Sequence, residues 1–245
     1  MVKRELFIII QARMTSSRLE GKVMLPLCGK SVLEIMLKRL KYFHDNIIIA
    51  TPKDEKQQPI IELCKKLGIK HYQGSEENVL NRYYEAALNF GAKNEDIIVR
   101  LTSDCPLIDQ NIVKEIIEFY EHSNVDYVSN VEKRTFPVGM DTEVFSFTSL
   151  KEAHKNAHTI YDIEHVTPWI KRHLKTKNVK NGYDYSRYRL TLDTWDDYLT
   201  IKSIYELFDC KTDFSYTQLI EKLSSTPQIT AINEKETKKE YEYSI

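Results

Sequence analysis

The chain carries no excess of charge of either sign: 35 lysines and arginines stand against 36 aspartates and glutamates, for a net charge of −1 over 245 residues. Balanced charge gives no reason to expect bulk nucleic acid or a membrane surface as a partner, since both attract positively charged proteins. No apolar run approaches the roughly 20 residues of a membrane-spanning helix, and the run in MVKRELFIII is too short for a signal-peptide core. We therefore expect a cytoplasmic protein with no nucleic acid and no membrane as partner.

Paired cysteines and a P-loop are also missing. The four cysteines, Cys28, Cys64, Cys105 and Cys210, include no CxxC pair. This scatter is typical neither of a metal site nor of a disulfide framework, so we expect no disulfide, in keeping with a reducing cytoplasm. The phosphate-binding string GxxxxGK[ST] is absent, which excludes a P-loop. No internal repeat and no low-complexity linker divides the chain.

What the sequence does contain is a regular alternation of β-branched runs and amphipathic stretches, with 42% hydrophobic residues to build a core. Strands are expected at 6–10, 47–51, 69–73, 96–102 and 125–130, and helices at 31–43, 58–68, 77–91 and 110–122. Apolar strands alternating with two-faced helices predict βαβ units. The predicted fold class is α/β, with a Rossmann-like, mostly parallel sheet and helices on both faces.

The second part of the chain has a different pattern. It predicts strands at 143–147 and 188–193, and helices near 149–156, 162–173 and 196–208. We interpret residues 1–232 as one domain, with a nucleotide-binding core at 1–130 and a substrate and dimerisation region at 131–186. Residues 233–245 (NEKETKKEYEYSI) form a charged tail that we expect to be frayed.

Ligands of open α/β sheets sit beyond the carboxyl ends of the strands. The segments to inspect are therefore 11–22, 51–54, 73–82, 102–107, 130–143 and 193–196. The first of them carries Arg13, Arg18 and Lys22 among several hydroxyls, and Glu20 is its one acid. Cations, hydroxyls and backbone amides are what a triphosphate needs. A solvated basic loop is the alternative that charge alone leaves open.

The string R-x-x-S-x-R-L-x-G-K in this loop resembles the signature of the sugar-acid cytidylyltransferases, which include the synthetases of CMP-Kdo and CMP-sialic acid. The resemblance is nearest to the SpsF-like branch of spore-coat polysaccharide enzymes, although Glu20 stands where a proline is usual. It extends over residues 5–208. Further strings match in order: GSEENVLNRYYEAA (74–87), VRLTSDCPLID (99–109), RTFPVGMDTEVFS (134–146), EHVTPWI (164–170) and TLDTWDDY (191–198).

The resemblance implies a nucleotide-diphospho-sugar transferase fold, CTP and a divalent metal, which we expect to be Mg²⁺. It also implies a homodimer formed through the region after residue 130. The expected reaction transfers CMP from CTP to a sugar acid or sugar phosphate and releases pyrophosphate, for surface or flagellar glycan synthesis. In such a reaction the protein mainly positions the nucleophile and stabilises charge on the phosphoryl oxygens.

Two aspartates are the candidate metal ligands. Asp104 and Asp193 each follow a predicted strand, and magnesium prefers one or two protein carboxylates together with phosphate oxygens. The alternative is that each aspartate caps the next helix. Lys22 and Arg13 are the candidates for stabilising the transferred phosphoryl group, one as a point charge and one as a planar fork. Arg18 suits an internal ion pair.

The remaining candidates concern nucleotide and acceptor. The nucleotide-binding set is Gln11, Ala12, Arg13, Ser17, Lys22, Arg82, Thr102 and Ser103. Arg82 enters through the resemblance, with an exposed helix charge as the alternative, and the related Kdo enzymes have a glutamine near Ser103 that this chain lacks. The substrate-binding set is Asp141, Glu143, Glu164 and His165. The first two should point to one side of an extended segment, and the last two should begin a helix.

Two other functions remain open. A glycosyltransferase of the same broad fold would use a nucleotide sugar rather than make one. Such enzymes usually present a D-x-D pair, where this chain has Ser103-Asp104-Cys105-Pro106. A non-catalytic binding subunit is the second alternative, and the presence of Lys22 with both candidate metal aspartates disfavours it.

Overall fold

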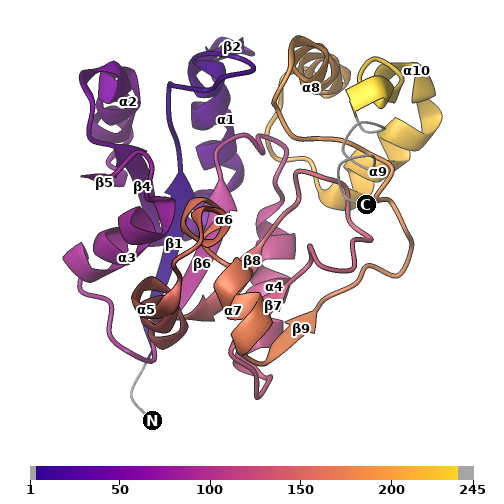
Figure 1. Ribbon diagram of the computed structural model, residues 1–245. Helices are drawn as coiled ribbons and strands as arrows, with labels where there is room; N and C mark the ends of the chain where they lie inside the picture. Colours follow the sequence, from indigo (N-terminus) through magenta and orange to yellow (C-terminus); the bar gives the residue numbers. More distant parts are fainter. Residues whose placement is uncertain (1–3, 237–245) are drawn as a thin grey trace.

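The computed structural model describes residues 4–236, and its centre is a seven-stranded sheet in the order β5-β4-β1-β6-β8-β7-β9 (Figure 1). The strands are β1 (Leu6–Gln11), β4 (Ile47–Pro52), β5 (Lys70–Gly74), β6 (Ile97–Thr102), β7 (Tyr127–Ser129), β8 (Glu143–Ser146) and β9 (Thr176–Asn178). The first four in spatial order are parallel, whereas β8 runs antiparallel to both β6 and β7. The predicted α/β class with a mostly parallel sheet is confirmed.

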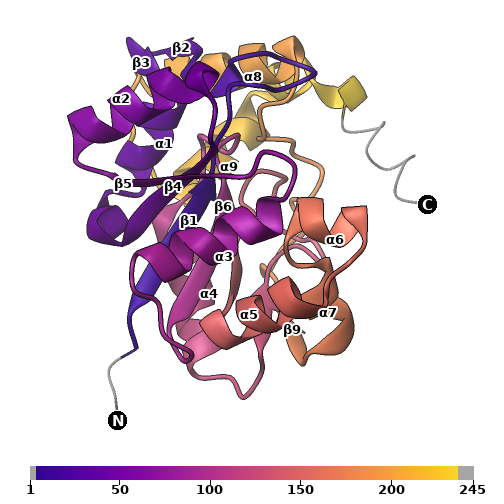
Figure 2. The same cartoon turned by 60° about the vertical axis from the view of Figure 1, so that its left-hand side comes forward.

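Helices cover both faces of the sheet, as predicted (Figure 2). Alternate residues of β1 face opposite ways: Ile8 and Ile10 join a core with α1, α2, α4, α8 and α9, while Phe7 and Ile9 join one with α3, α5 and α7. The helices are α1 (Val32–Arg39), α2 (Gln58–Leu67), α3 (Val79–Asn89), α4 (Gln110–Glu121), α5 (Phe147–Asn156), α6 (Ile160–His165), α7 (Pro168–His173), α8 (Trp195–Leu207), α9 (Tyr216–Ser225) and α10 (Pro227–Thr230). None of these helices is long and apolar enough to cross a membrane.

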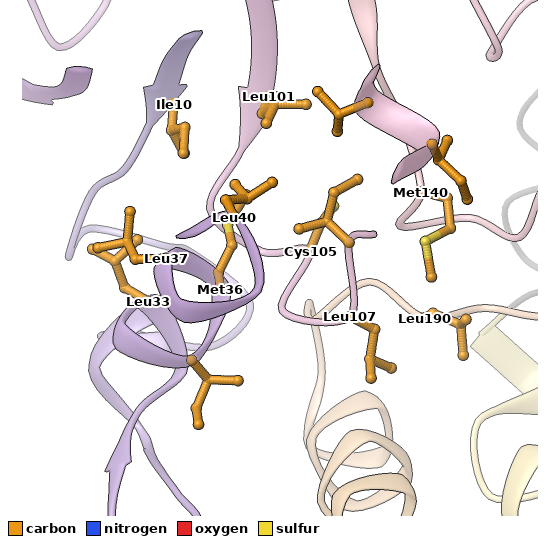
Figure 3. Packing of buried hydrophobic residues seen from close by; sticks show 14 of the residues in the cluster. Ile10, Leu33, Met36, Leu37, Leu40, Leu101, Cys105, Leu107, Met140 and Leu190 are labelled. Atoms are coloured by element: carbon orange, nitrogen blue, oxygen red, sulfur yellow. The ribbon is translucent and has the colours of Figure 1, made fainter. Parts of the chain in front are cut away.

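The loop after β6 is anchored in the larger core. Cys105 and Leu107 are buried, and Figure 3 shows them between the apolar side chains of α1 and Leu190. Cys105 thus serves as a small buried residue of this core. Because the residues that follow Asp104 are packed in this way, the loop holds that aspartate at the carboxyl edge of the sheet.

The predicted strand at 188–193 is wrong. This segment is extended, but its one bridge pairs Arg189 with Val138, outside the sheet. Gly139 (φ 102) permits the close approach, since a Cβ there would lie 2.6 Å from the carbonyl carbon of Leu190.

Several other boundaries differ from the prediction. The single helix expected over 162–173 is two helices, because Pro168 lacks an amide hydrogen and begins a new helix after Val166 (φ 71). Strand β9, helices α9 and α10, and the hairpin of β2 (Pro26–Leu27) and β3 (Lys30–Ser31) were not predicted. Three short 3₁₀ helices were missed as well: η1 (Lys22–Met24), η2 (Lys41–Asn46) and η3 (Glu55–Gln57).

The expectation of no disulfide is also wrong. Cys28, in the turn between β2 and β3, is bonded to Cys210 after α8, with their Cα atoms 5.5 Å apart. The two cysteines are 182 residues apart in the chain, so no local spacing indicates the pair. Cys64 and Cys105 are free and buried.

Replacing both Cys28 and Cys210 by serine should lower the free energy of unfolding by about 2–4 kcal/mol, because the cross-link restricts a long loop of the unfolded chain. Urea unfolding monitored by circular dichroism measures this difference. Thiol titration of the unfolded, unreduced chain should detect two of the four cysteines. Titration of all four would show that the disulfide does not form.

The predicted tail does not begin at residue 233. Asn233 is 2% exposed and donates hydrogen bonds to the Arg189 carbonyl and to Asp197. Residue 233 therefore belongs to the packed body of the protein, and residues 237–245 of the predicted tail lie outside the part of the chain that the structure describes.

Candidate active site

A cavity of about 990 Å³ opens at the carboxyl ends of β1 and β6, where Gln11 and Thr102 end their strands. Its position agrees with the rule that ligands of open α/β sheets bind beyond the strand ends. Twelve of the fourteen predicted site residues line it: Gln11, Ala12, Arg13, Ser17, Lys22, Arg82, Thr102, Ser103, Asp104, Glu164, His165 and Asp193.

Lys22 lies at the centre of one wall, between the two predicted metal ligands. Its Nζ atom is 2.9 Å from Asp104 Oδ2 and 2.8 Å from Asp193 Oδ1. Gly21 precedes it in a left-handed conformation (φ 66) and directs the chain from the loop into η1. The three residues come from widely separated parts of the chain, and the backbone bond from Leu192 N to Asp104 O (2.8 Å) holds the segments of Asp193 and Asp104 together.

Neither aspartate caps a helix. The cap of α4 is Asp109, and the cap of α8 is Thr194, whose side chain accepts from the amide of Asp197. The capping roles that were the alternative for Asp104 and Asp193 are thus filled by other residues. Both carboxylates face the cavity instead.

The charges of this group stabilise one another. Burial by itself lowers the pKa of Lys22, but the carboxylates of Asp104 and Asp193 outweigh burial and raise it above its ordinary value. Burial likewise raises the pKa of Asp104, and the ammonium of Lys22 outweighs this and lowers it. Lys22 and Asp104 are therefore both charged at neutral pH. Arg18 adds a further ion pair, with Nη2 2.9 Å from Asp193 Oδ1, which is the internal pairing expected for it.

Two more arginines extend the positive wall. Arg82 is 2% exposed, so the alternative of an exposed helix charge is wrong, and its Nη1 donates to the carbonyls of Ser75 and Glu76. Burial is the main cause that lowers the pKa of Arg82, and repulsion from Arg13 lowers it further. Arg13 is exposed and makes no hydrogen bond or ion pair with residues 4–236. Its guanidinium is free to bind a ligand.

Helix α6 forms the facing wall. Glu164 and His165 lie at the end of this helix rather than at the beginning of one, and Ile160 and Ile163 add an apolar surface beside them. Burial lowers the pKa of His165, so its imidazole is neutral at physiological pH. Neither the side chain of Glu164 nor that of His165 has a hydrogen-bond partner within the described part of the chain.

Asp141 and Glu143 do not line the cavity. Asp141 precedes β8 and forms a two-bonded pair with Arg134, at 2.5 and 2.9 Å. Glu143 is 5% exposed, pairs with Arg100 in the opposite register position of β6, and accepts from the Tyr127 hydroxyl at 2.7 Å. Period-two alternation cannot predict this, because cross-strand partners depend on sheet register.

Replacing Glu143 by alanine should cost about 3–5 kcal/mol of stability, because Arg100 would remain buried without its charge partner. The matched control is Asp141→Ala, which breaks a half-exposed pair and should cost about 1 kcal/mol or less. Urea unfolding of the two variants gives both values. Equal losses would contradict the assignment of Glu143 to a buried structural pair.

Some residues of the cavity were not predicted. Ser16, Glu76, Glu77, Asn78 and Val79 lie in segments 11–22 and 73–82, which the strand-end rule had marked without singling them out. Ile160 and Ile163 were beyond that rule, because α6 reaches the cavity from outside the strand-end loops. Only tertiary packing places this helix there.

The donor atoms suit magnesium. Asp104 and Asp193 each direct a carboxylate oxygen at the ammonium group of Lys22. The two carboxylates are therefore close enough to share one cation. No group of three or more His, Cys, Asp or Glu side chains able to hold a metal occurs among residues 4–236. Two carboxylates, completed by phosphate oxygens and water, match Mg²⁺, whereas a structural zinc site would need four protein ligands.

Fold and cavity together define an α/β protein with a cavity lined by cationic side chains at the carboxyl edge of its sheet. The family model for cytidylyltransferases matches residues 7–241. The chain belongs to the cytidylyltransferase family, in agreement with the resemblance of its motifs.

Relatives support this assignment over nearly the whole chain. An uncharacterised protein of Methanocaldococcus jannaschii is 37% identical over 240 residues, covering 95% of this chain and 96% of the relative. The spore coat polysaccharide biosynthesis protein SpsF of Bacillus subtilis is 32% identical, covering 91% and 95%.

Solved structures agree with the fold. A cytidylyltransferase from Leptospira borgpetersenii superimposes with a TM-score of 0.87 at 36% identity, covering 93% of this chain and 97% of that one. A CMP:2-keto-3-deoxy-manno-octonic acid synthetase complexed with CTP has a TM-score of 0.60 at 16% identity, covering 83% and 99%. At that identity the second likeness concerns the fold alone.

Proposed function

We propose that this protein is a magnesium-dependent cytidylyltransferase that transfers CMP from CTP to a sugar acid or sugar phosphate. The observation that carries the proposal is Lys22 held between Asp104 and Asp193 in a cavity whose wall also carries Arg13, Arg18 and Arg82. Four cations suit a triphosphate, and two carboxylates suit the metal ion that accompanies one. The cytidylyltransferase family supplies the expectation of CTP.

Each group has a defined task in this proposal. Lys22 exchanges an aspartate oxygen for a phosphate oxygen and stabilises charge at the α-phosphorus as a point charge, while Arg13 holds two oxygens with its planar fork. Asp104 and Asp193 hold Mg²⁺, which when bound neutralises phosphate charge. Gln11, Ala12, Ser17, Thr102 and Ser103 surround the nucleoside and phosphates together with Arg82.

The wall formed by α6 receives the acceptor. Glu164 accepts hydrogen bonds from sugar hydroxyls, and Ile160 and Ile163 cover an apolar face of the ring. An acceptor oxygen bonds to the α-phosphorus, the bond between the α- and β-phosphates breaks, and pyrophosphate leaves. When the attacking group is a hydroxyl, its proton passes to the neutral imidazole of His165.

The names of relatives suggest the pathway. SpsF is described as a spore coat polysaccharide biosynthesis protein, and a 3-deoxy-manno-octulosonate cytidylyltransferase of Coxiella burnetii is 29% identical over 175 residues. We therefore assign this chain to surface or flagellar glycan synthesis. The exposed Tyr161 on α6 suits a homodimer contact within the region after residue 130.

A pyrophosphate-release assay with each nucleoside triphosphate, Mg²⁺ and a panel of sugar acids and sugar phosphates tests the proposal. Release with CTP and one acceptor is the expected result and names the substrate. Release with another triphosphate would retain the chemistry and overturn CTP.

The melting temperature of the protein with different ligands distinguishes the proposed function from the glycosyltransferase and binding-subunit alternatives. A nucleotidyltransferase should melt at a higher temperature with CTP and Mg²⁺, because ligands stabilise the state that binds them. A protein that responds only to finished nucleotide sugars, and releases no pyrophosphate with any pair, would contradict the proposed function.

A further inference from the structure

The two oxygens of the Asp193 carboxylate have different environments. Oδ1 faces the cavity cations, 2.8 Å from Lys22 and 2.9 Å from Arg18. Oδ2 accepts from Nη2 of Arg189 at 3.0 Å. The side chain of Arg18 is 59% exposed, whereas that of Arg189 is 1% exposed. One oxygen is thus turned toward ligand space and the other toward the protein interior.

Arg189 is itself held by a buried carboxylate. Its Nε and Nη2 atoms lie 2.9 and 3.2 Å from the two oxygens of Asp197, which is 0% exposed. Oδ2 of Asp197 also accepts from the backbone amides of Asp193 and Thr194, both at 3.0 Å. Asp197 therefore accepts hydrogen bonds both from the backbone of Asp193 and from the Arg189 guanidinium that binds the Asp193 side chain.

Asn233, near the C-terminal end of the described chain, adds two hydrogen bonds to this network. Nδ2 of Asn233, which follows α10, donates to Asp197 Oδ1 at 2.8 Å and to the Arg189 carbonyl at 3.0 Å. Figure 1 shows α8, α9 and α10 gathered at one corner of the molecule, and α8 and α10 are in direct contact. This C-terminal layer connects through Asn233 to a residue of the cavity.

We infer that Arg189, Asp197 and Asn233 are positioning residues that hold Asp193 with Oδ1 directed at the metal. This inference rests on the proposed function. With CTP and Mg²⁺ bound, Asp193 would hold the metal through Oδ1 while Arg189 still donates to Oδ2, and Lys22 and Arg18 would be available to phosphate oxygens. Without the hydrogen bond from Arg189, the Asp193 carboxylate would exchange between rotamers. A metal ligand that is not held in place binds the metal more weakly.

Arg189→Lys and Asn233→Ala test the inference. Lysine keeps the charge but cannot bridge two carboxylates as a planar fork does, and alanine removes only the last link. Mn²⁺ binding in the presence of CTP, measured by electron paramagnetic resonance, should weaken about 10–100-fold in Arg189→Lys and less in Asn233→Ala. CTP binding without metal, measured by calorimetry, should stay at the wild-type value in both variants.

Asn130→Ala is the matched control. Asn130 is as buried as Asn233 and donates from Nδ2 to the Met140 carbonyl at 2.7 Å, but it does not line the cavity. Its loss should lower the melting temperature without changing Mn²⁺ binding.

Unchanged Mn²⁺ affinity in Asn233→Ala, or an equal loss in Asn130→Ala, would overturn the inference. Should Arg189→Lys fail to fold, Asn233→Ala still decides the question, because it leaves both carboxylates and the guanidinium in place. A wild-type chain that binds neither CTP nor Mn²⁺ would instead overturn the proposed function, and with it this inference.

Discussion

Replacing Lys22 by methionine should lower the rate of pyrophosphate release by at least about 10²–10³-fold, the effect of losing one group that stabilises transition-state charge. Methionine fills a similar volume but carries no charge. Lys22 is 9% exposed and contacts both candidate metal ligands, so no neighbouring lysine can replace it. Initial rates at saturating CTP measure the effect.

Lys30→Met is the control for that variant. Lys30 lies in β3, on the hairpin that follows the same loop, and it does not line the cavity. Its replacement should leave the rate unchanged. Wild-type turnover by Lys22→Met would remove Lys22 from the chemistry.

Lys22 also determines how stability depends on pH. In the wild type, the pKa of Asp104 lies below its ordinary 3.8 because Lys22 outweighs the effect of burial. The resulting stabilisation is present above pH 3.8 and is lost as the pH falls through the lower folded value. In Lys22→Met, burial and the facing Asp193 raise the pKa of Asp104 instead. We therefore expect that variant to gain stability on acidification from neutral pH, which melting curves between pH 7 and 5 would show.

Asp104→Asn should lower metal-dependent activity by about 10³-fold while leaving the fold intact, because a metal ligand is worth several kcal/mol of charge stabilisation and each 1.4 kcal/mol is a factor of ten. Asparagine has the shape of aspartate, and the backbone carbonyl of residue 104 would still accept from Leu192. The rate should be measured as a function of Mg²⁺ concentration, with circular dichroism to confirm the fold.

Asp141→Asn is the companion variant, since Asp141 pairs with Arg134 and lies outside the cavity. It should retain wild-type activity at every Mg²⁺ concentration. An Asp104→Asn enzyme with full activity and an unaltered Mg²⁺ requirement would sink the metal assignment.

Much of this site is a consequence of local sequence. The apolar run of β1 and the basic loop after it are adjacent in the chain, so the cationic wall of Arg13, Arg18 and Lys22 follows once the strand is recognised. Asp104 was predictable for the same reason, because β6 lies beside β1 and parallel strands end at one edge. Asp193 was placed correctly at the cavity although the strand predicted before it does not exist in the sheet.

Long-range contacts were decided by the tertiary structure alone. The bond between Cys28 and Cys210, the pairing of Glu143 with Arg100 and the position of α6 join parts of the chain whose local patterns carry no sign of one another. Period and spacing report which face of an element is apolar, and they do not report which distant element covers it.

The sequence by itself thus determined the class of fold, the family and the chemical character of one wall of the cavity. These features depend on short sequence motifs and on the succession of strands and helices along the chain. The tertiary structure decided the position of α6 along the cavity and the support of Asp193 by Arg189, Asp197 and Asn233. The physical reason is that a polar group must find a hydrogen-bond partner only when it is buried away from water. Which groups are buried together is settled only when the chain has folded.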